Sequence, residues 1–290
     1  MPDKRVLLLG ATGTLGSHLA KVLPNKFLVV RPRPRGLDTS PGHDDMNWLS
    51  TSIDVANQAS IYELVREAQP DMVVNCIAVT PGTPYAGDHR INILVNSLFP
   101  HVLAAASRNH GAHLIHISTD GVFSGRRGNY AEEDLPDPPD LYGRSKLLGE
   151  VTSENSLTIR TTFFGLSPKR DGLVDWLISN RGQTVKGFAS YTFSGLSLTS
   201  LGRVLISIIE SSAPVTGLYH VGGPPLSKYN LLRMLSDKLD LHARIEPATT
   251  PYIDRSLDSS RFWKAIEMDM PKLEIMIDEI QQQVADASTC

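Results

Sequence analysis

A short apolar run that ends in a glycine turn constrains the fold of this chain more than any other feature. Val6-Leu7-Leu8-Leu9 leads into Gly10-Ala11-Thr12-Gly13-Thr14-Leu15-Gly16, and helix-forming residues follow as far as Leu23. This order predicts a buried strand, a tight turn and a helix. Gly10 would permit the turn, Gly13 would let the backbone approach a pyrophosphate, and Gly16 would let the helix pack closely on the strand. The predicted cofactor contacts at this turn are Gly10, Thr12, Gly13, Thr14, Leu15 and Gly16.

Apolar runs alternate with helical patterns through the first 160 residues. The runs at 27–30, 72–78 and 113–117 are predicted strands, and another strand is expected to end near Ile53. Between them, Ile61, Leu64, Val65 and Ala68 form one helical stripe, and a longer helix is predicted from about 91 to 108. Strands that are apolar on both faces indicate a parallel sheet covered by helices on both sides. We therefore predict an α/β fold with a doubly wound, Rossmann-like parallel sheet.

The pattern becomes less regular after Phe163, where a substrate lobe would be built. We predict a dinucleotide-binding domain at residues 1–162, rejoined by parts of 197–222. Residues 163–290 then form a smaller, mixed substrate-binding lobe.

Composition limits the partners of this chain. Of its 290 residues, 41% are hydrophobic and 20% are charged, and a net charge of −3 gives no electrostatic reason to expect nucleic acid or an acidic membrane surface. Two cysteines, Cys76 and Cys290, make a disulfide framework improbable. The N-terminus lacks a signal-peptide core, and no apolar run approaches the roughly 18 residues of a membrane span. A soluble cytoplasmic protein is expected, and no metal site, because the histidines have no partners at ligand spacing.

Arg31 lies about twenty residues after the glycine turn, where an acidic residue would bind a ribose 2′-hydroxyl. An arginine there suits a 2′-phosphate, so we predict NADPH, with NADH as the alternative cofactor. Asp54, after the third predicted strand, is either an adenine contact or a helix cap before Gln58. Ala78, at the end of the next strand, completes the predicted cofactor contacts together with Lys146.

Tyr142 and Lys146 lie four residues apart, and Ser118-Thr119-Asp120 lies just over twenty residues upstream. On a helix, this spacing puts the phenol and the ammonium on one face, one turn apart. A nearby cation lowers the pKa of a tyrosine from its usual value near ~10 and prepares it for proton exchange.

The glycine turn, Ser118-Thr119-Asp120 and Tyr142-x-x-x-Lys146 together resemble the extended short-chain dehydrogenase/reductase superfamily. Within it, Ser118 to Gly125, Tyr142 to Glu150 and Gly217 to Val221 resemble the dTDP-4-dehydrorhamnose reductase family. The resemblance runs from residue 5 to about 265 and is strong in the first 160 residues.

The resemblance implies reduction of the 4-keto group of a nucleotide-linked 6-deoxyhexose by a nicotinamide hydride, in nucleotide-sugar and polysaccharide biosynthesis. It gives Tyr142 the role of proton donor, Lys146 that of lowering the tyrosine pKa and holding the nicotinamide ribose, and Thr119 a hydrogen bond to the same ketone oxygen. The substrate contacts it implies are Thr119, Asp120, Tyr142 and Phe163.

Gly121 departs from the family pattern. Related dehydratases carry a glutamate at this position, and the reductases usually carry a tyrosine, so the identity of the sugar stays open. Two alternatives also stay open: an epimerase that retains NAD, and a non-catalytic nucleotide-binding regulatory subunit. A homodimer is a further partner that the sequence leaves undecided.

Overall fold

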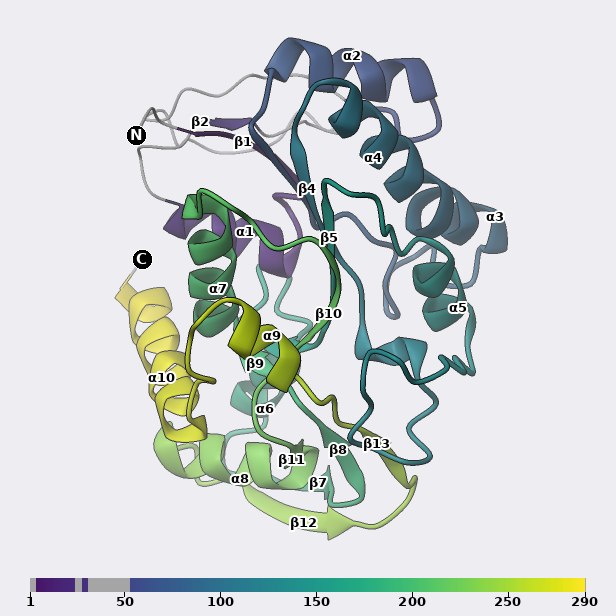
Figure 1. Cartoon of the computed structure of the whole chain (residues 1–290). Coiled ribbons are helices and arrows are strands. Elements are labelled where there is room, and N and C mark those ends of the chain that lie inside the picture. Colours follow the sequence, from purple (N-terminus) through teal and green to yellow (C-terminus); the bar gives the residue numbers. More distant parts are fainter. Residues whose placement is uncertain (1–3, 24–27, 31–52, 290) are drawn as a thin grey trace. The chain divides into compact units, whose positions relative to one another are not determined.

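The computed structural model describes residues 4–23, 28–30 and 53–289 (Figure 1). Two units divide the chain between them. The first comprises Met1–Ser118, Pro138–Ile159 and Ile206–Leu218, and the second comprises Thr119–Asp137, Arg160–Leu205 and Tyr219–Cys290.

A parallel sheet forms the centre of the first unit, as predicted, and two of its strands, ending at Thr161 and Val221, continue into residues of the second unit. Its strands are β1 (Arg5–Leu9), β2 (Leu28–Val30), β3 (Met72–Asn75), β4 (His113–Ile117), β5 (Ser156–Thr161) and β10 (Gly217–Val221), and their order is β10-β5-β4-β3-β1-β2. The register pairs Leu9 with Asn75 and Asn75 with His116. The residues that follow these strands therefore meet at one edge of the sheet, where ligands bind in folds of this class.

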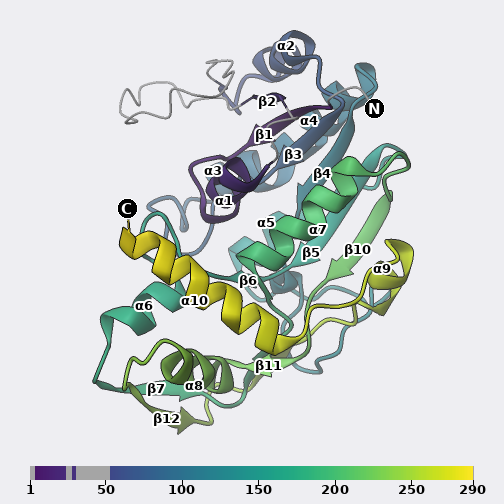
Figure 2. The same cartoon turned by 90° about the vertical axis from the view of Figure 1, so that its left-hand side faces the viewer.

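Helices cover both faces of the sheet in this unit. Figures 1 and 2 show α2 (Gln58–Ala68) and α4 (Phe99–Asn109) on one face and α1 (Thr14–Val22) on the other. Asn57 caps α2 by accepting the Ser60 N–H, and the left-handed Gln69 ends it just before Pro70. The predicted stripe of Ile61, Leu64, Val65 and Ala68 is buried against Leu7, Val73 and Leu114 of the sheet. The predicted α/β fold is thus confirmed.

Two local predictions need correction. The single helix predicted from 91 to 108 consists of α3 (His89–Asn92), a π-helical turn η1 (Ile93–Leu98) and α4, because side-chain periodicity does not reveal a local change in backbone winding. The strand expected to end near Ile53 is not described: residues 51–52 lie outside the described ranges, and Ile53 belongs to no strand.

Short strands and helices make up the second unit. Its elements are η2 (Asp120–Val122), β6 (Phe163–Phe164), α6 (Leu173–Ser179), β7 (Thr184–Phe188), β8 (Tyr191–Phe193), β9 (Leu196–Ser197), β11 (Leu226–Ser227), α8 (Lys228–Lys238), β12 (Arg244–Ala248), β13 (Ile253–Arg255), α9 (Ser260–Ala265) and α10 (Leu273–Thr289). The strands form sheets in the orders β11-β8-β13, β12-β7 and β6-β9, while α7 (Leu198–Glu210) begins in this unit and ends in the first.

The division differs in part from the predicted domains. Residues 119–137, which the sequence analysis placed in the first domain, belong to the second unit. This segment returns to the second unit because Tyr130 exchanges backbone hydrogen bonds with Ser256 and Asp258. The assignment of cofactor to 1–162 and substrate to 163–290 stays a prediction.

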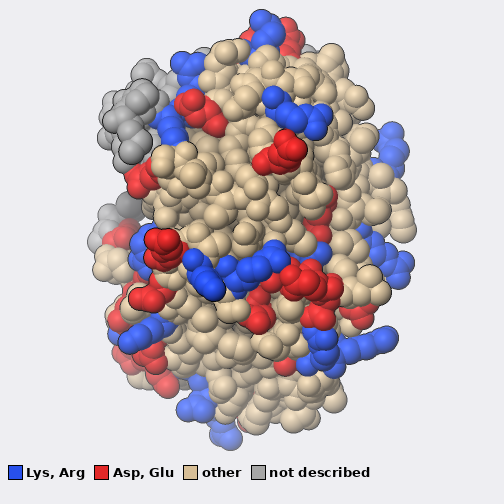
Figure 3. All heavy atoms as spheres, in the orientation of Figure 1, with Lys and Arg blue, Asp and Glu red and all other residues tan. Residues whose placement is uncertain are grey.

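Among the described residues, no helix is long and apolar enough to cross a membrane. Figure 3 shows Lys and Arg beside Asp and Glu on the visible face, so charges of both signs are interspersed there.

Gly149 provides a test of the packing that positions α5 (Leu141–Leu148) on η1. A Cβ at Gly149 would overlap the backbone oxygen of Asn96, so Gly149→Ala must push the two elements apart. We expect a loss of about 1–3 kcal/mol of unfolding free energy in urea denaturation. Gly87→Ala, where nothing lies within 4 Å of the added carbon, should change stability by less than about 0.5 kcal/mol. Equal stability of the two variants would contradict this packing argument.

Candidate active site

Backbone contacts fix the glycine turn on the edge of the sheet. Gly10 has a φ of +84°, and a Cβ there would lie 2.8 Å from the carbonyl carbon of Cys76 at the end of the neighbouring strand. A Cβ at Gly16 would overlap the oxygen of Gly10. Both glycines are therefore required by the fold itself, as predicted for the turn and for close packing of α1 on β1.

Gly13 is different because the fold does not require it. It has φ −81° and ψ 170°, and an added Cβ would meet only the Gly10 oxygen, at 3.4 Å, in ordinary contact. Gly13 immediately precedes α1, has no side chain to cap the helix, and is followed by a first turn without acidic residues. The helix N-terminus thus keeps its partial positive charge for a bound anion.

The other predicted cofactor residues have varied surroundings. Thr12 is exposed, Thr14 is half-buried and Leu15 is buried, so Leu15 could meet a ligand only through its backbone. Ala78 is half-buried beyond the end of β3. Arg31 lies outside the described residues.

Asp54 is exposed and does not cap α2. Its carboxylate accepts the Ala56 N–H at 3.0 Å, closing a local turn, while Asn57 caps the helix. The expected alternative of a cap at Asp54 is therefore wrong by three residues, since Asn and Asp compete for the same role at helix starts. Its adenine contact stays a prediction.

Tyr142 and Lys146 both lie in α5, so the predicted helix is present. Asp140 caps it by accepting the Gly143 N–H at 2.7 Å. Tyr142 is half-buried, whereas Lys146 is only 1% exposed. The four-residue spacing therefore places a partly accessible phenol one turn from a buried ammonium.

The Lys146 ammonium is held at the end of β4. Its Nζ donates a hydrogen bond of 2.7 Å to the Ile117 carbonyl, two residues before Thr119. Burial lowers the pKa of Lys146 to about 8, while the negative charge of Glu150 and the thiol of Cys76 act in the opposite direction. Lys146 is thus mainly protonated at neutral pH, as a role beside a proton donor needs.

The π-helical turn η1 supports this helix through buried polar side chains. Asn96, fully buried, accepts the Val79 N–H at 2.8 Å and donates to the Val79 carbonyl at 2.9 Å and to the Ser145 hydroxyl at 3.0 Å. Ser97 donates to the Ser145 carbonyl at 2.8 Å. The segment after β3 and the helix with Tyr142 are therefore held by one element.

Thr119 begins the second unit directly after Ser118. Its hydroxyl accepts the Gly121 N–H at 3.0 Å and donates to the Asp120 carboxylate at 3.2 Å. Burial raises the pKa of Asp120 to about 6, and the charge of Arg255, the Thr119 hydrogen bond and the charge of Lys228 oppose this rise. The carboxylate of Asp120 is thus tied to Thr119.

Lys228 and Arg255 are two cations near Asp120 that the sequence did not assign to the site. Strand β8 pairs with β11, which ends one residue before Lys228, and with β13, which ends at Arg255. The Lys228 ammonium lies 3.6 Å from the ring centroid of Tyr191, and Nε of Arg255 is buried without a hydrogen-bond partner in the structure. A buried guanidinium nitrogen without an acceptor among the described residues suits an anionic ligand. Lys228 and Arg255 are distant in sequence, and the pairing of β8 with β11 and β13 brings them together.

Phe163, the predicted aromatic substrate contact, is half-buried in β6, whereas its neighbour Phe164 is 5% exposed and belongs to the core. Phe163 therefore keeps a partly accessible ring, and its contact with a substrate stays a prediction.

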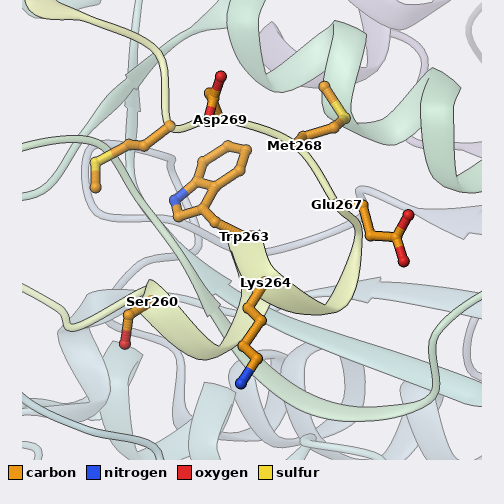
Figure 4. Close-up of a pocket in the computed structure, with 7 residues that line it drawn as sticks. Ser260, Trp263, Lys264, Glu267, Met268 and Asp269 are labelled. Atoms are coloured by element: carbon orange, nitrogen blue, oxygen red, sulfur yellow. The ribbon is translucent and has the colours of Figure 1, made fainter.

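A hollow of about 400 Å³ lies elsewhere in the second unit (Figure 4). The residues around it are Ser260, Trp263, Lys264, Glu267, Met268, Asp269 and Met270. The Trp263 indole donates to the Gly222 carbonyl at 3.0 Å and is 6% exposed, so it serves the fold. None of the predicted site residues lines this hollow. Within the described part of the chain, no three His, Cys, Asp or Glu side chains are grouped to hold a metal ion.

Comparison with known proteins identifies the family. The model of the RmlD substrate binding domain matches residues 4–262. The spore coat polysaccharide biosynthesis protein SpsK of Bacillus subtilis is 32% identical over 253 residues, covering 85% of this chain and 83% of that protein. A dTDP-4-dehydrorhamnose reductase of Aggregatibacter actinomycetemcomitans is 28% identical over 239 residues, covering 76% and 74%.

Similarity extends to a protein of another kind and to solved structures. Methionine adenosyltransferase 2 subunit beta of Xenopus laevis is 26% identical over 304 residues, covering 95% of this chain and 83% of that protein. The crystal structure of dTDP-4-dehydrorhamnose reductase from Bacillus anthracis in complex with NADP has a TM-score of 0.79 at 21% identity, covering 96% and 98% of the two chains. That structure shares the fold. The family match over most of the chain confirms the resemblance drawn from the motifs, and the chain belongs to the RmlD substrate binding domain family.

Proposed function

We propose that this chain is an NADPH-dependent reductase of the 4-keto group of a nucleotide-linked 6-deoxyhexose, acting in nucleotide-sugar and polysaccharide biosynthesis. The observation that carries the proposal is Tyr142 one helical turn from the buried Lys146. Membership of the family and relatives named as dTDP-4-dehydrorhamnose reductase and as a polysaccharide biosynthesis protein support it.

The residues of the glycine turn fit a dinucleotide. Gly13 leaves room where a side chain would meet a pyrophosphate, and the N–H groups that begin α1 would bind its oxygens. Lys146 would hold the nicotinamide ribose, and Arg31 the 2′-phosphate. When bound, the reduced nicotinamide supplies a hydride to the ketone carbon.

The side chains supply the proton and the stabilisation of charge. Reduction of a ketone leaves negative charge on its oxygen, and the Tyr142 hydroxyl donates the proton there. Lys146, cationic below a pKa of about 8, favours release of that proton by stabilising the phenolate that Tyr142 becomes. Thr119 would donate a second hydrogen bond to the oxygen and so stabilise the transition state. Lys228 and Arg255 would meet negative charge on the nucleotide-linked substrate.

The first test is turnover. Purified protein should oxidise NADPH in the presence of a dTDP-4-keto-6-deoxyhexose, with a higher kcat/KM for NADPH than for NADH. Sugar conversion by tightly retained NAD, without net cofactor consumption, would identify an epimerase. Cofactor binding without turnover over a panel of nucleotide sugars would favour a regulatory subunit. A cytoplasmic location and a homodimer stay predictions.

Tyr142→Phe removes the proton donor and keeps the ring. We expect kcat to fall by about 100-fold or more, with cofactor affinity nearly unchanged, as measured by steady-state kinetics and by NADPH fluorescence titration. Tyr62→Phe, in α2 against the core of the first unit, is the matched control and should keep full activity. Normal turnover of Tyr142→Phe would remove Tyr142 from the mechanism.

Gly13→Ala separates cofactor binding from folding. Its backbone angles suit alanine and the new Cβ meets only the Gly10 oxygen, so stability should change by less than about 0.5 kcal/mol. The methyl group would occupy space assigned to the pyrophosphate, so we expect the Kd for NADPH to rise about tenfold or more, measured by fluorescence titration. Gly16→Ala should instead lower stability, because its Cβ overlaps the Gly10 oxygen. Unchanged affinity in stable Gly13→Ala protein would place the pyrophosphate elsewhere.

A further inference from the structure

The stripe of α5 that carries Tyr142 and Lys146 continues to Glu150. These three residues follow one another at steps of four. Helix α5 ends at Leu148, but the Glu150 N–H still bonds to the Leu147 carbonyl at 3.2 Å. A last tight turn therefore carries the chain to Glu150, two residues beyond the end of α5.

Lys146 and Glu150 bind consecutive residues at the end of β4. The Lys146 ammonium donates to the Ile117 carbonyl at 2.7 Å, and the Ser118 hydroxyl donates to the Glu150 carboxylate at 2.8 Å. Ser118 is 4% exposed, and its N–H bonds to the Ile159 carbonyl at 2.7 Å. Glu150 thus fixes the residue that immediately precedes Thr119.

Because Ile117 and Ser118 are consecutive, these two hydrogen bonds bring the Glu150 carboxylate and the Lys146 ammonium to the same end of β4, where the negative charge of Glu150 raises the pKa of Lys146. Besides Tyr142, one turn away in α5, Cys76 after β3 and His116 in β4 are described titratable side chains whose charges interact with Lys146. Burial raises the pKa of the Cys76 thiol to about 12 and holds the pKa of His116 well below its usual value, so both are uncharged at neutral pH. Among the described groups that act on the pKa of Lys146, Glu150 is then the one that is negatively charged at neutral pH and offsets the buried ammonium.

We propose that Glu150 is a positioning residue, which anchors Ser118 at the end of β4 and keeps Lys146 a cation. It touches no reacting atom and acts through these two residues. The consequence for catalysis rests on the proposed function, whereas the protonation of Lys146 can be measured without turnover.

Two substitutions separate the hydrogen bond between Ser118 and Glu150 from the negative charge of Glu150. Glu150→Gln keeps an oxygen that accepts from Ser118 and removes the charge. Ser118→Ala removes the anchor and keeps the charge. Glu154→Gln removes the same charge from an exposed side chain four residues further on and serves as the matched control. Glu150→Ala is a second charge-removing variant, and circular dichroism checks the fold of each protein.

The primary measurement is an NMR titration of protein labelled at the lysine ε-carbons, with Lys146→Met identifying the resonance. In Glu150→Gln, the pKa of Lys146 should fall by about one pH unit, because an opposite charge nearby is lost. In Ser118→Ala and Glu154→Gln it should stay at the wild-type value. An unchanged pKa in folded Glu150→Gln or Glu150→Ala would overturn the proposal, whether or not the protein turns over a sugar.

The activity measurement follows the same logic. The alkaline limb of the kcat/KM profile should move to lower pH in Glu150→Gln, because Lys146 loses its proton earlier. Ser118→Ala should lower kcat with an unshifted limb. Equal shifts of the alkaline limb in Glu150→Gln and Ser118→Ala would show that the charge of Glu150 and its hydrogen bond to Ser118 do not have separate effects. Absence of turnover in the wild-type protein would reject the proposed function alone.

Discussion

The geometry of this site depends on the hydrogen bond that the buried ammonium of Lys146 makes. Transfer of a charge from water to a protein interior costs several kcal/mol unless hydrogen bonds and opposite charge compensate it. Here the Ile117 carbonyl accepts one hydrogen bond at 2.7 Å. Because that carbonyl belongs to β4, the requirement to satisfy Lys146 ties α5 to the end of a central strand. Tyr142 is then placed by the helix rather than by contacts of its own.

Close backbone packing makes this arrangement rigid. Gly149 lets α5 approach Asn96 in η1, Gly10 lets the first turn lie against the end of β3, and Gly16 lets α1 pack on that turn. At each position a methyl group would meet backbone atoms, which cannot move aside as a flexible side chain can. Asn96 adds hydrogen bonds on both sides, to Val79 and to Ser145. The segment after β3 and the helix that carries Tyr142 are therefore linked through η1 in the first unit.

The parts of the site that the sequence predicted are those set by local spacing. The glycine turn and the Tyr142–Lys146 pair each depend on residues within one turn of each other, and periodicity reveals such relations. Asn96 and Glu150 act through contacts distant in sequence, as do Lys228 and Arg255 around Asp120, and no local pattern reports which strands will meet. The short strands β8, β11 and β13 escaped prediction for the same reason, since three or fewer residues carry no period.

Gly121 bears on the chemistry because it has a backbone N–H but no side chain. Its N–H holds the Thr119 hydroxyl, and any residue except proline could supply that donor, so the change at this position leaves the support of Thr119 intact. What it removes is a side chain, and with it the second carboxylate of a dehydratase.

The acidic residues nearest in sequence do not replace that carboxylate. Glu132 accepts the His220 N–H at 3.0 Å, Glu133 pairs with Arg261 at 2.9 Å, and Asp134 pairs with Arg127. Asp120 itself accepts a hydrogen bond from the Thr119 hydroxyl. With each of these carboxylates engaged within its own unit, elimination of water lacks a dedicated acid and base. Proton donation by Tyr142 to a ketone needs neither, so the structure favours reduction.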